Sequence, residues 1–122
     1  MNHKCIYVRD QNLIDVYKLG GSSDIVNRGS TYITGEYEKC KFIKIWKIKN
    51  IPWSIAEYGI KKHFRYLNSY VGSGTEYFNK EILNKIEPYF QDNNIEYEEI
   101  DINIIERKIR EKLENDNKKK EE

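Results

Sequence analysis

Three segments have the hydrophobic pattern of β-strands: two are rich in Ile, Val and Tyr, and the third alternates apolar and polar residues with a two-residue period. They are Lys4–Arg9, Asp15–Leu19 and Lys41–Lys49. The polar, turn-prone link Asp10–Asn12 predicts that the first two segments pair as an antiparallel hairpin. In the third segment, the alternation predicts that Phe42 and Trp46 lie on the same face of the sheet.

Other apolar residues recur at the three- and four-residue spacing of amphipathic helices. The first predicted helix is Asp24–Arg28, capped by Ser22 or Ser23 and ended by Gly29. The others run from Pro52 to about Leu67, from the N-cap Asn79 to Pro88, and from Ile100 to Leu113. A short strand is possible at Ile95–Tyr97. This order predicts an α+β fold, a small three-stranded antiparallel sheet flanked by helices, with an added C-terminal helix.

The 122 residues suffice for one domain of ordinary size with a modest core. We expect a core over residues 1–90, an extension over 91–114 and a charged, disordered tail over 115–122. The apolar stripe from Ile100 to Leu113 predicts a helix that covers the core. The alternative is that this C-terminal helix binds a protein partner or a second copy of the chain.

No apolar run approaches the roughly 20 residues that span a bilayer, so we expect no membrane association. Arg9 and Asp10 interrupt the only candidate signal-peptide run, which predicts an intracellular protein of the cytoplasm, nucleus or a viral replication compartment, not a secreted one. Cys5 and Cys40 are too few for a disulfide framework and have no zinc-ligand spacing. They are expected to be free thiols that serve as packing residues.

Charge is unevenly distributed, although the net charge is only +1. From Lys39 to Arg65 the chain carries eight basic residues and a single acid, Glu57, whereas Glu96–Asp101 is acidic. The basic stretch could face phosphates, or it could be a solvated, lysine-rich strand face; the charges alone leave both interpretations open.

Two tyrosines, an arginine and a glutamate are the candidate catalytic residues. Tyr7 and Tyr17 lie on neighbouring predicted strands, Arg28 follows Gly20 by eight residues, and Glu57 lies on the helix after the third strand. Phenols, a guanidinium and a carboxylate suit a phosphodiester with one divalent metal. The structural alternatives are a cross-strand aromatic pair of Tyr7 with Tyr17 and an ordinary ion pair of Arg28 with Glu57.

In this order and spacing the residues resemble the GIY-YIG nuclease superfamily, whose core is a small three-stranded antiparallel sheet flanked by helices. Ile6-Tyr7 matches the first signature and Tyr17-Lys18-Leu19-Gly20 the second. Arg28 has the family's spacing, and Tyr32 stands where members carry a histidine or tyrosine. Glu57 falls where the family keeps its metal-binding carboxylate.

The resemblance covers roughly Lys4 to Phe90. The segment Gly72–Phe78 is similar to the Gly-x-x-Glu-Trp-Phe ending of a phage and large-virus branch, often described as DNA-binding. The sequence also departs from the family at three places. Cys5 replaces the first signature glycine, and Lys18 and Leu19 make the second signature a weaker match. Lys61 stands where the viral branch usually has a histidine.

The resemblance implies an endonuclease that hydrolyses DNA with one divalent metal, Mg²⁺ or Mn²⁺. The implied catalytic residues are Tyr7, Tyr17, Arg28, Tyr32 and Glu57, with Glu57 as metal ligand and Lys18, Lys61 and Asn79 as substrate-binding residues. A phenol accepts a proton poorly at neutral pH unless positive charge lies nearby, so the tyrosines would depend on Arg28 or the metal. The departures favour an alternative, a DNA-binding module of the same fold that cuts weakly or not at all.

Overall fold

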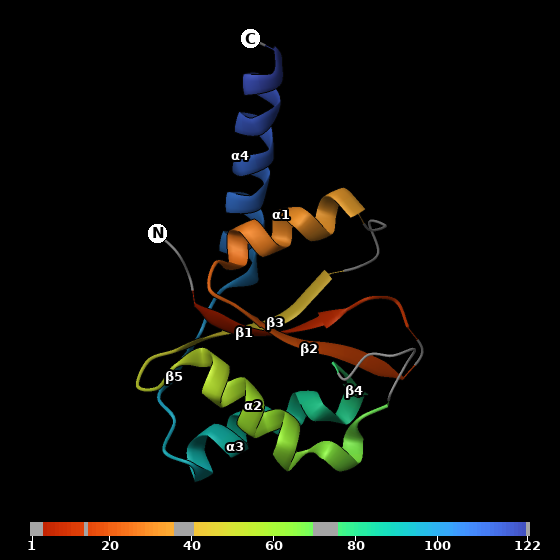
Figure 1. Cartoon of the computed structure of the whole chain (residues 1–122), viewed down its shortest axis with the longest axis vertical. Coiled ribbons are helices and arrows are strands. Elements are labelled where there is room, and N and C mark those ends of the chain that lie inside the picture. Colours follow the sequence, from red (N-terminus) through yellow and green to blue (C-terminus); the bar gives the residue numbers. More distant parts are fainter. Residues whose placement is uncertain (1–3, 14, 36–40, 70–75, 122) are drawn as a thin grey trace.

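An antiparallel β-sheet forms the middle layer of the protein, with helices on both of its faces (Figure 1). The computed structural model describes residues 4–13, 15–35, 41–69 and 76–121, and of residues 32–35 and 117–121 the backbone alone. Within these residues the sheet has five strands in the order β4-β2-β1-β3-β5. The strands are β1 (Cys5–Asp10), β2 (Val16–Ser22), β3 (Lys41–Ile48), β4 (Tyr77–Asn79) and β5 (Tyr97–Glu99).

The mixed α+β fold and the antiparallel sheet confirm the sequence prediction, but the expected number of three strands is wrong. The three predicted strands occupy the centre, and the short strands β4 and β5 form the two edges. Tyr17 of β2 pairs with Phe78 of β4, and Ile48 of β3 pairs with Tyr97 of β5. Because each edge strand has only three residues, neither one shows the alternation by which a strand is recognised in a sequence.

A β-bulge in β3 overturns the prediction that Phe42 and Trp46 share a face. Val8 of β1 pairs with Lys44, whereas the next residue, Arg9, pairs with Phe42, so Ile43 is the extra residue. Because of this extra residue, the residues of β3 that precede Ile43 point to the opposite face from the one that unbroken alternation would give them. Phe42 and Trp46 therefore belong to two different cores.

One face of the sheet is covered by α2 (Trp53–His63), the 3₁₀ turns η1 (Arg65–Leu67) and η2 (Lys80–Asn84), and α3 (Ile86–Asp92). These elements bury the larger of the two cores, which includes Ile6, Leu19, Trp46, Ile60 and Phe90. The predicted N-cap is confirmed at Asn79, whose Oδ1 accepts a hydrogen bond from the backbone N–H of Glu81.

The opposite face is covered by α1 (Ile25–Gly35) and α4 (Ile102–Glu121), which pack against each other (Figure 1). Ile105 and Ile109 of α4 are buried there with Tyr7, so the predicted apolar stripe covers a second core. This gives the C-terminal helix an internal packing role. The helix continues to Glu121, through residues for which the sequence predicted a disordered tail.

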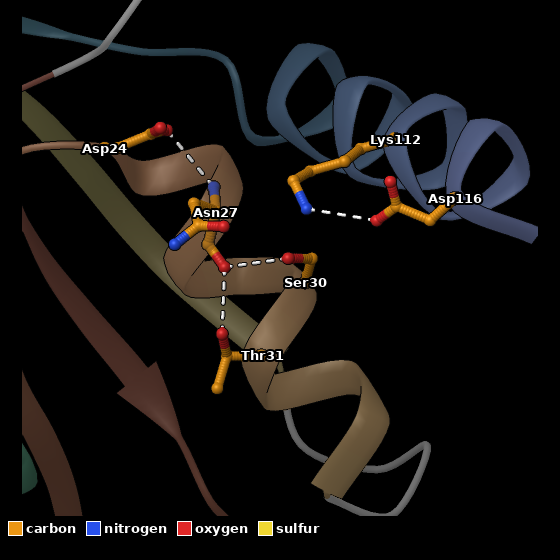
Figure 2. A network of polar contacts seen from close by, with 6 residues as sticks. All are labelled: Asp24, Asn27, Ser30, Thr31, Lys112 and Asp116. Atoms are coloured by element: carbon orange, nitrogen blue, oxygen red, sulfur yellow. Dashed lines mark hydrogen bonds and ion pairs between the residues drawn. The ribbon is translucent and has the colours of Figure 1, made fainter. Parts of the chain in front are cut away.

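Helix α1 begins with a cap from Asp24, not from Ser22 or Ser23 as predicted (Figure 2). Asp24 Oδ1 accepts a hydrogen bond from the backbone N–H of Asn27 at 3.2 Å, and Ser22 Oγ accepts one from the N–H of Asp24 at 3.0 Å. The prediction that Gly29 ends the helix is also wrong. Gly29 lies inside α1, where a Cβ would overlap Cδ1 of Ile109, so its missing side chain lets α4 approach.

Cys5 is a packing residue, as predicted, because its side chain is completely buried in the second core. Burial raises the pKa of the Cys5 thiol to about 12, so the unreactive protonated form persists at neutral pH. Cys40 lies outside the described residues. Among the described residues, no helix is both long enough and apolar enough to cross a membrane.

Candidate active site

The candidate site forms around two adjacent glycines, Gly20 and Gly21, in the second half of β2. The paired register with β4 covers Val16–Lys18, so the glycines lie beyond the end of that short strand. Adjacent residues of a strand face opposite sides of the sheet. Each glycine therefore leaves room for a side chain from a different layer.

Tyr7 approaches the pair at Gly20. The two residues are directly opposite in the register of β1 and β2, and a Cβ at Gly20 would lie 2.6 Å from both Cζ and Oη of Tyr7. The phenol ring thus lies across β2 where no side chain blocks it. Phe42 holds the ring from another side through an edge contact at 5.4 Å between ring centroids. Tyr7 is only 2% exposed.

Glu57 approaches the pair at Gly21, from α2 on the other face. A Cβ at Gly21 would overlap Oε2 of Glu57 and the indole ring of Trp53. Consecutive Cα atoms are about 3.8 Å apart, so the phenol and the carboxylate converge on one dipeptide from opposite faces of the sheet. The two predicted site residues therefore contact adjacent glycines, with the sheet between them.

Lys61 is the ion-pair partner of Glu57. Lys61 Nζ lies 2.8 Å from Oε1 of Glu57, one helical turn along α2, and the two side chains are 23% and 17% exposed. Oε1 is thus occupied by Lys61, while Oε2 faces Gly21. The ion-pair partner of Glu57 is therefore Lys61 of the same helix, and not Arg28 as the structural alternative expected.

Tyr17 is not brought together with Tyr7. Tyr17 packs against the first core and Tyr7 lies in the second, on opposite faces of the sheet. Tyr17 pairs with Phe78 and Tyr7 with Gly20, which excludes the cross-strand tyrosine pair. Tyr17 shares its face with Glu57 but precedes Gly21 by four residues, about 13 Å along a strand. Lys80 Nζ lies 5.1 Å from the centre of its ring.

Arg28 lies exposed on α1, on the same side of the sheet as Tyr7. Within the described part of the chain it makes no ion pair, so its guanidinium is available to a phosphate. Tyr32 follows one turn later on α1, and its side chain lies outside the described residues. Residues 72–75 of the branch-specific motif also lie outside them.

Lys18 and Asn79, predicted to bind substrate, lie toward the other end of β2. Lys18 Nζ forms an ion pair with Oε2 of Glu76 at 3.4 Å. Asn79 is paired with Val16 and lines a cavity of about 640 Å³ that Tyr66 also borders. Lys61, the third predicted substrate-binding residue, contacts the candidate catalytic residue Glu57.

The basic and acidic blocks of the sequence meet across β3 and β5. Lys44 Nζ lies 2.7 Å from Oε1 of Glu99, and Lys49 Nζ lies 3.4 Å from Oε2 of Glu98. The hydrogen bond to Glu99 raises the pKa of Lys44. These two lysines are therefore partly neutralised, which favours the strand-face interpretation for this portion of the basic stretch.

Sequence reasoning missed the contribution of Trp53 and Gly21 to the site. Trp53 precedes Glu57 by four residues, so both side chains lie on the same face of α2, and that spacing could have associated them. The contact of both with Gly21 depends on how α2 packs on the sheet, which no local pattern in the sequence reveals.

Glu57 is the candidate metal ligand. Within the described residues, no group of three or more His, Cys, Asp or Glu side chains could hold a metal ion. Mg²⁺ keeps several waters and is commonly held by one or two carboxylates together with substrate phosphates. A single carboxylate is the donor that such an ion commonly takes, and Glu57 would supply it in competition with Lys61.

Comparisons with protein-family models, with curated proteins and with solved structures found no match for this chain. The family resemblance therefore rests on the residues of the sequence alone. The activity that it implies is a proposal, to be judged on the geometry around Gly20 and Gly21.

Proposed function

We propose that the protein is a divalent-metal-dependent endonuclease of the GIY-YIG type that hydrolyses DNA phosphodiester bonds beside Gly20 and Gly21. One observation carries the proposal: the phenol of Tyr7 and the carboxylate of Glu57 reach the same dipeptide from opposite faces of the sheet. Their convergence requires two glycines in succession, since a side chain at either position would overlap one of the two groups.

Each residue has a role in this reaction. Glu57 would hold Mg²⁺ or Mn²⁺, which supplies charge stabilisation to the phosphoryl and leaving oxygens. Tyr7 would accept the proton of the attacking water, because its hydroxyl lies at Gly20, next to the glycine that the Glu57 carboxylate contacts from the other face. Exposed Arg28 would bind a phosphate oxygen with its planar fork of donors. Lys61 would contact a second phosphate oxygen when it leaves Glu57.

Two observations favour the second candidate function, a DNA-binding module of the same fold that cuts weakly or not at all. Tyr7 is almost completely buried, which restricts the access of water to its hydroxyl. Lys61 already neutralises one oxygen of Glu57. Both features would slow hydrolysis and leave phosphate binding by Arg28 intact.

Nicking of supercoiled plasmid in Mg²⁺ or Mn²⁺ tests the proposal, with Glu57→Gln as the variant. We expect nicking by the wild type, none in EDTA, and a loss of at least a hundredfold in Glu57→Gln because the amide is a poor metal ligand. Glu87→Gln is the matched control, since Glu87 is also a partly buried glutamate beside a lysine, Lys44. It should nick like the wild type.

Metal-dependent nicking that persists in Glu57→Gln would contradict the assigned site. An inactive wild type that nevertheless retards DNA in a gel, with retardation weakened by salt, would favour the binding module. Thermal unfolding of each variant shows whether a loss of activity reflects a loss of fold.

A further inference from the structure

Strongly exposed aromatic and aliphatic side chains lie on α2, which carries Glu57, and on η1, which follows it in the chain. Among the described residues, four large hydrophobic side chains are strongly exposed, and three of them lie on α2 and η1: Ile55 (59%), Tyr58 (67%) and Tyr66 (70%). The fourth, Ile104, lies on α4 across the sheet. We use the term α2–η1 face for Ile55, Tyr58, Lys62, Arg65 and Tyr66.

The α2–η1 face is also positively charged. The exposed basic side chains of α2 and η1 are Lys62, His63 and Arg65, and no exposed side chain of these two elements is a carboxylate. The one acid of these elements, Glu57, is turned toward Gly21 and paired with Lys61. Lys62 and Arg65 make no ion pair with any described residue. An anionic partner would therefore meet two uncompensated cations.

The face adjoins the candidate site. Residues of an α-helix are separated by about 100° around the axis, so Glu57, Lys61, Tyr58, Lys62 and Ile55 follow one another in that order. A chain of phosphates lying along this path would extend from Glu57 past Lys62. The bases attached to those phosphates would then pass Tyr58.

Tyr66 lies at the other end of the face, beside the cavity of about 640 Å³. Phe64 supports its ring at 6.2 Å between centroids. Besides Tyr66, the cavity is lined by amide groups of Asn68 and Asn79 and by carboxylates of Asp15 and Glu81. The carboxylates disfavour a phosphate there, whereas amides and carboxylates both suit the hydrogen-bonding edge of a base.

We propose that the α2–η1 face binds unpaired nucleotides, with Tyr58 and Tyr66 stacking on bases and Lys62 and Arg65 contacting the phosphates between them. Base faces are accessible to aromatic side chains only when they are not stacked within a duplex. The inference rests on the proposed function, because it names the substrate class of that same site: nucleic acid with an unpaired stretch beside the bond that is cut.

Binding of fluorescently labelled oligonucleotides in EDTA tests the stacking part without any cleavage. The probes are a 15-nucleotide dT strand, the matching U strand and a duplex of equal length. We expect the full-length protein to bind the unpaired probes at least tenfold more tightly than the duplex. Tyr58→Ala and Tyr66→Ala should each weaken this binding about tenfold, since each removes a ring on which a base stacks.

Tyr58→Phe and Tyr66→Phe are the matched controls, because phenylalanine keeps the ring and loses only the hydroxyl. Both should bind like the wild type. The phosphate contacts are tested by Lys62→Ala and Arg65→Ala, each of which should lower the slope of log affinity against log salt by about 0.7. Arg107→Ala and Arg110→Ala remove the same charge from exposed positions of α4 and should leave the slope unchanged.

Equal affinity for duplex and unpaired probes, or unchanged binding in both tyrosine-to-alanine variants, would overturn the proposal. If plasmid nicking persisted alongside either result, the nuclease assignment would stand and only the α2–η1 face would fail. Ring-dependent binding by a protein that never nicks would support the face and overturn the nuclease. Binding of the U strand far above the dT strand would support the face and identify the substrate as RNA.

Discussion

Gly20 and Gly21 determine the geometry of the candidate site because each is covered by a functional side chain. Tyr7 lies over the first glycine and Glu57 over the second. Any Cβ at either position would displace the group above it. The missing side chains of Gly20 and Gly21 therefore shape the candidate site, whereas Tyr17 lies about 13 Å along its strand from Gly21.

Lys61 would limit the access of a divalent cation to Glu57 under the proposed function. Its ammonium and the metal would compete for the same carboxylate, and a partly buried pair of this kind contributes about 0.5–1 kcal/mol. Lys61→Met should therefore lower the Mg²⁺ concentration for half-maximal nicking by about two- to fivefold. A magnesium titration of the nicking rate measures this midpoint.

The matched control is Lys112→Met, which removes the lysine of another ion pair between residues four apart, that with Asp116 on α4 (Figure 2). Its midpoint should equal that of the wild type. A midpoint that stays constant or rises in Lys61→Met would mean that Lys61 does not compete with the metal at Glu57.

At the scale of elements, the packing of α4 on α1 depends on Gly29. Alanine has a helix propensity about 1 kcal/mol better than glycine, but its methyl group would overlap Cδ1 of buried Ile109. Overpacking of a core costs about 1–3 kcal/mol, so Gly29→Ala should lower the free energy of unfolding by about 1 kcal/mol. Urea denaturation measures the change.

Ile109→Val removes the overlapped methyl group and supplies the control. In that background, Gly29→Ala should be neutral or stabilising, because the helix propensity remains and the overlap is gone. An equal destabilisation in both backgrounds would show that the contact with Ile109 is not the cause.

The sequence predicted those elements whose pattern is long enough to read. Enrichment in Ile, Val and Tyr identified β1 and β2, alternation identified β3, and apolar spacing identified α2 and most of α4. Strand β4 was missed because three residues show no period, and the bulge at Ile43 was missed because it depends on pairing with β1. Gly29 was interpreted as a helix end because the sequence does not reveal its actual role. That role is a contact with Ile109 of α4, a residue eighty positions away in the chain.

The candidate site was predictable as a set of residues but not as a geometry. Tyr7 and Glu57 do meet at the glycine pair, whereas Tyr17 lies about 13 Å along its strand from Gly21. Which tyrosine faces which side follows from the register of β1 and β2, a long-range property. The exposure of Tyr58 and Tyr66 could not be predicted either, since the sequence does not distinguish a buried aromatic residue from an exposed one.

At the scale of the whole molecule, the sheet separates two cores, and the glycine pair lies where groups from both layers meet. Tyr7 belongs to the layer under α1 and α4, and Glu57 belongs to α2 on the other face (Figure 1). The α2–η1 face extends outward from Glu57. Glu57 thus shares α2 with Ile55, Tyr58 and Lys62 of the proposed nucleotide-binding surface.

The most direct test of the central claim is the nicking rate of Tyr7→Phe, Glu57→Gln and the double variant, with Tyr17→Phe as control. If Tyr7 and Glu57 act in one site, each single variant should lose at least a hundredfold, and the double variant little more than the worse single one. Tyr17→Phe should keep most of the activity. A Tyr7→Phe protein that nicks at the wild-type rate would contradict the account.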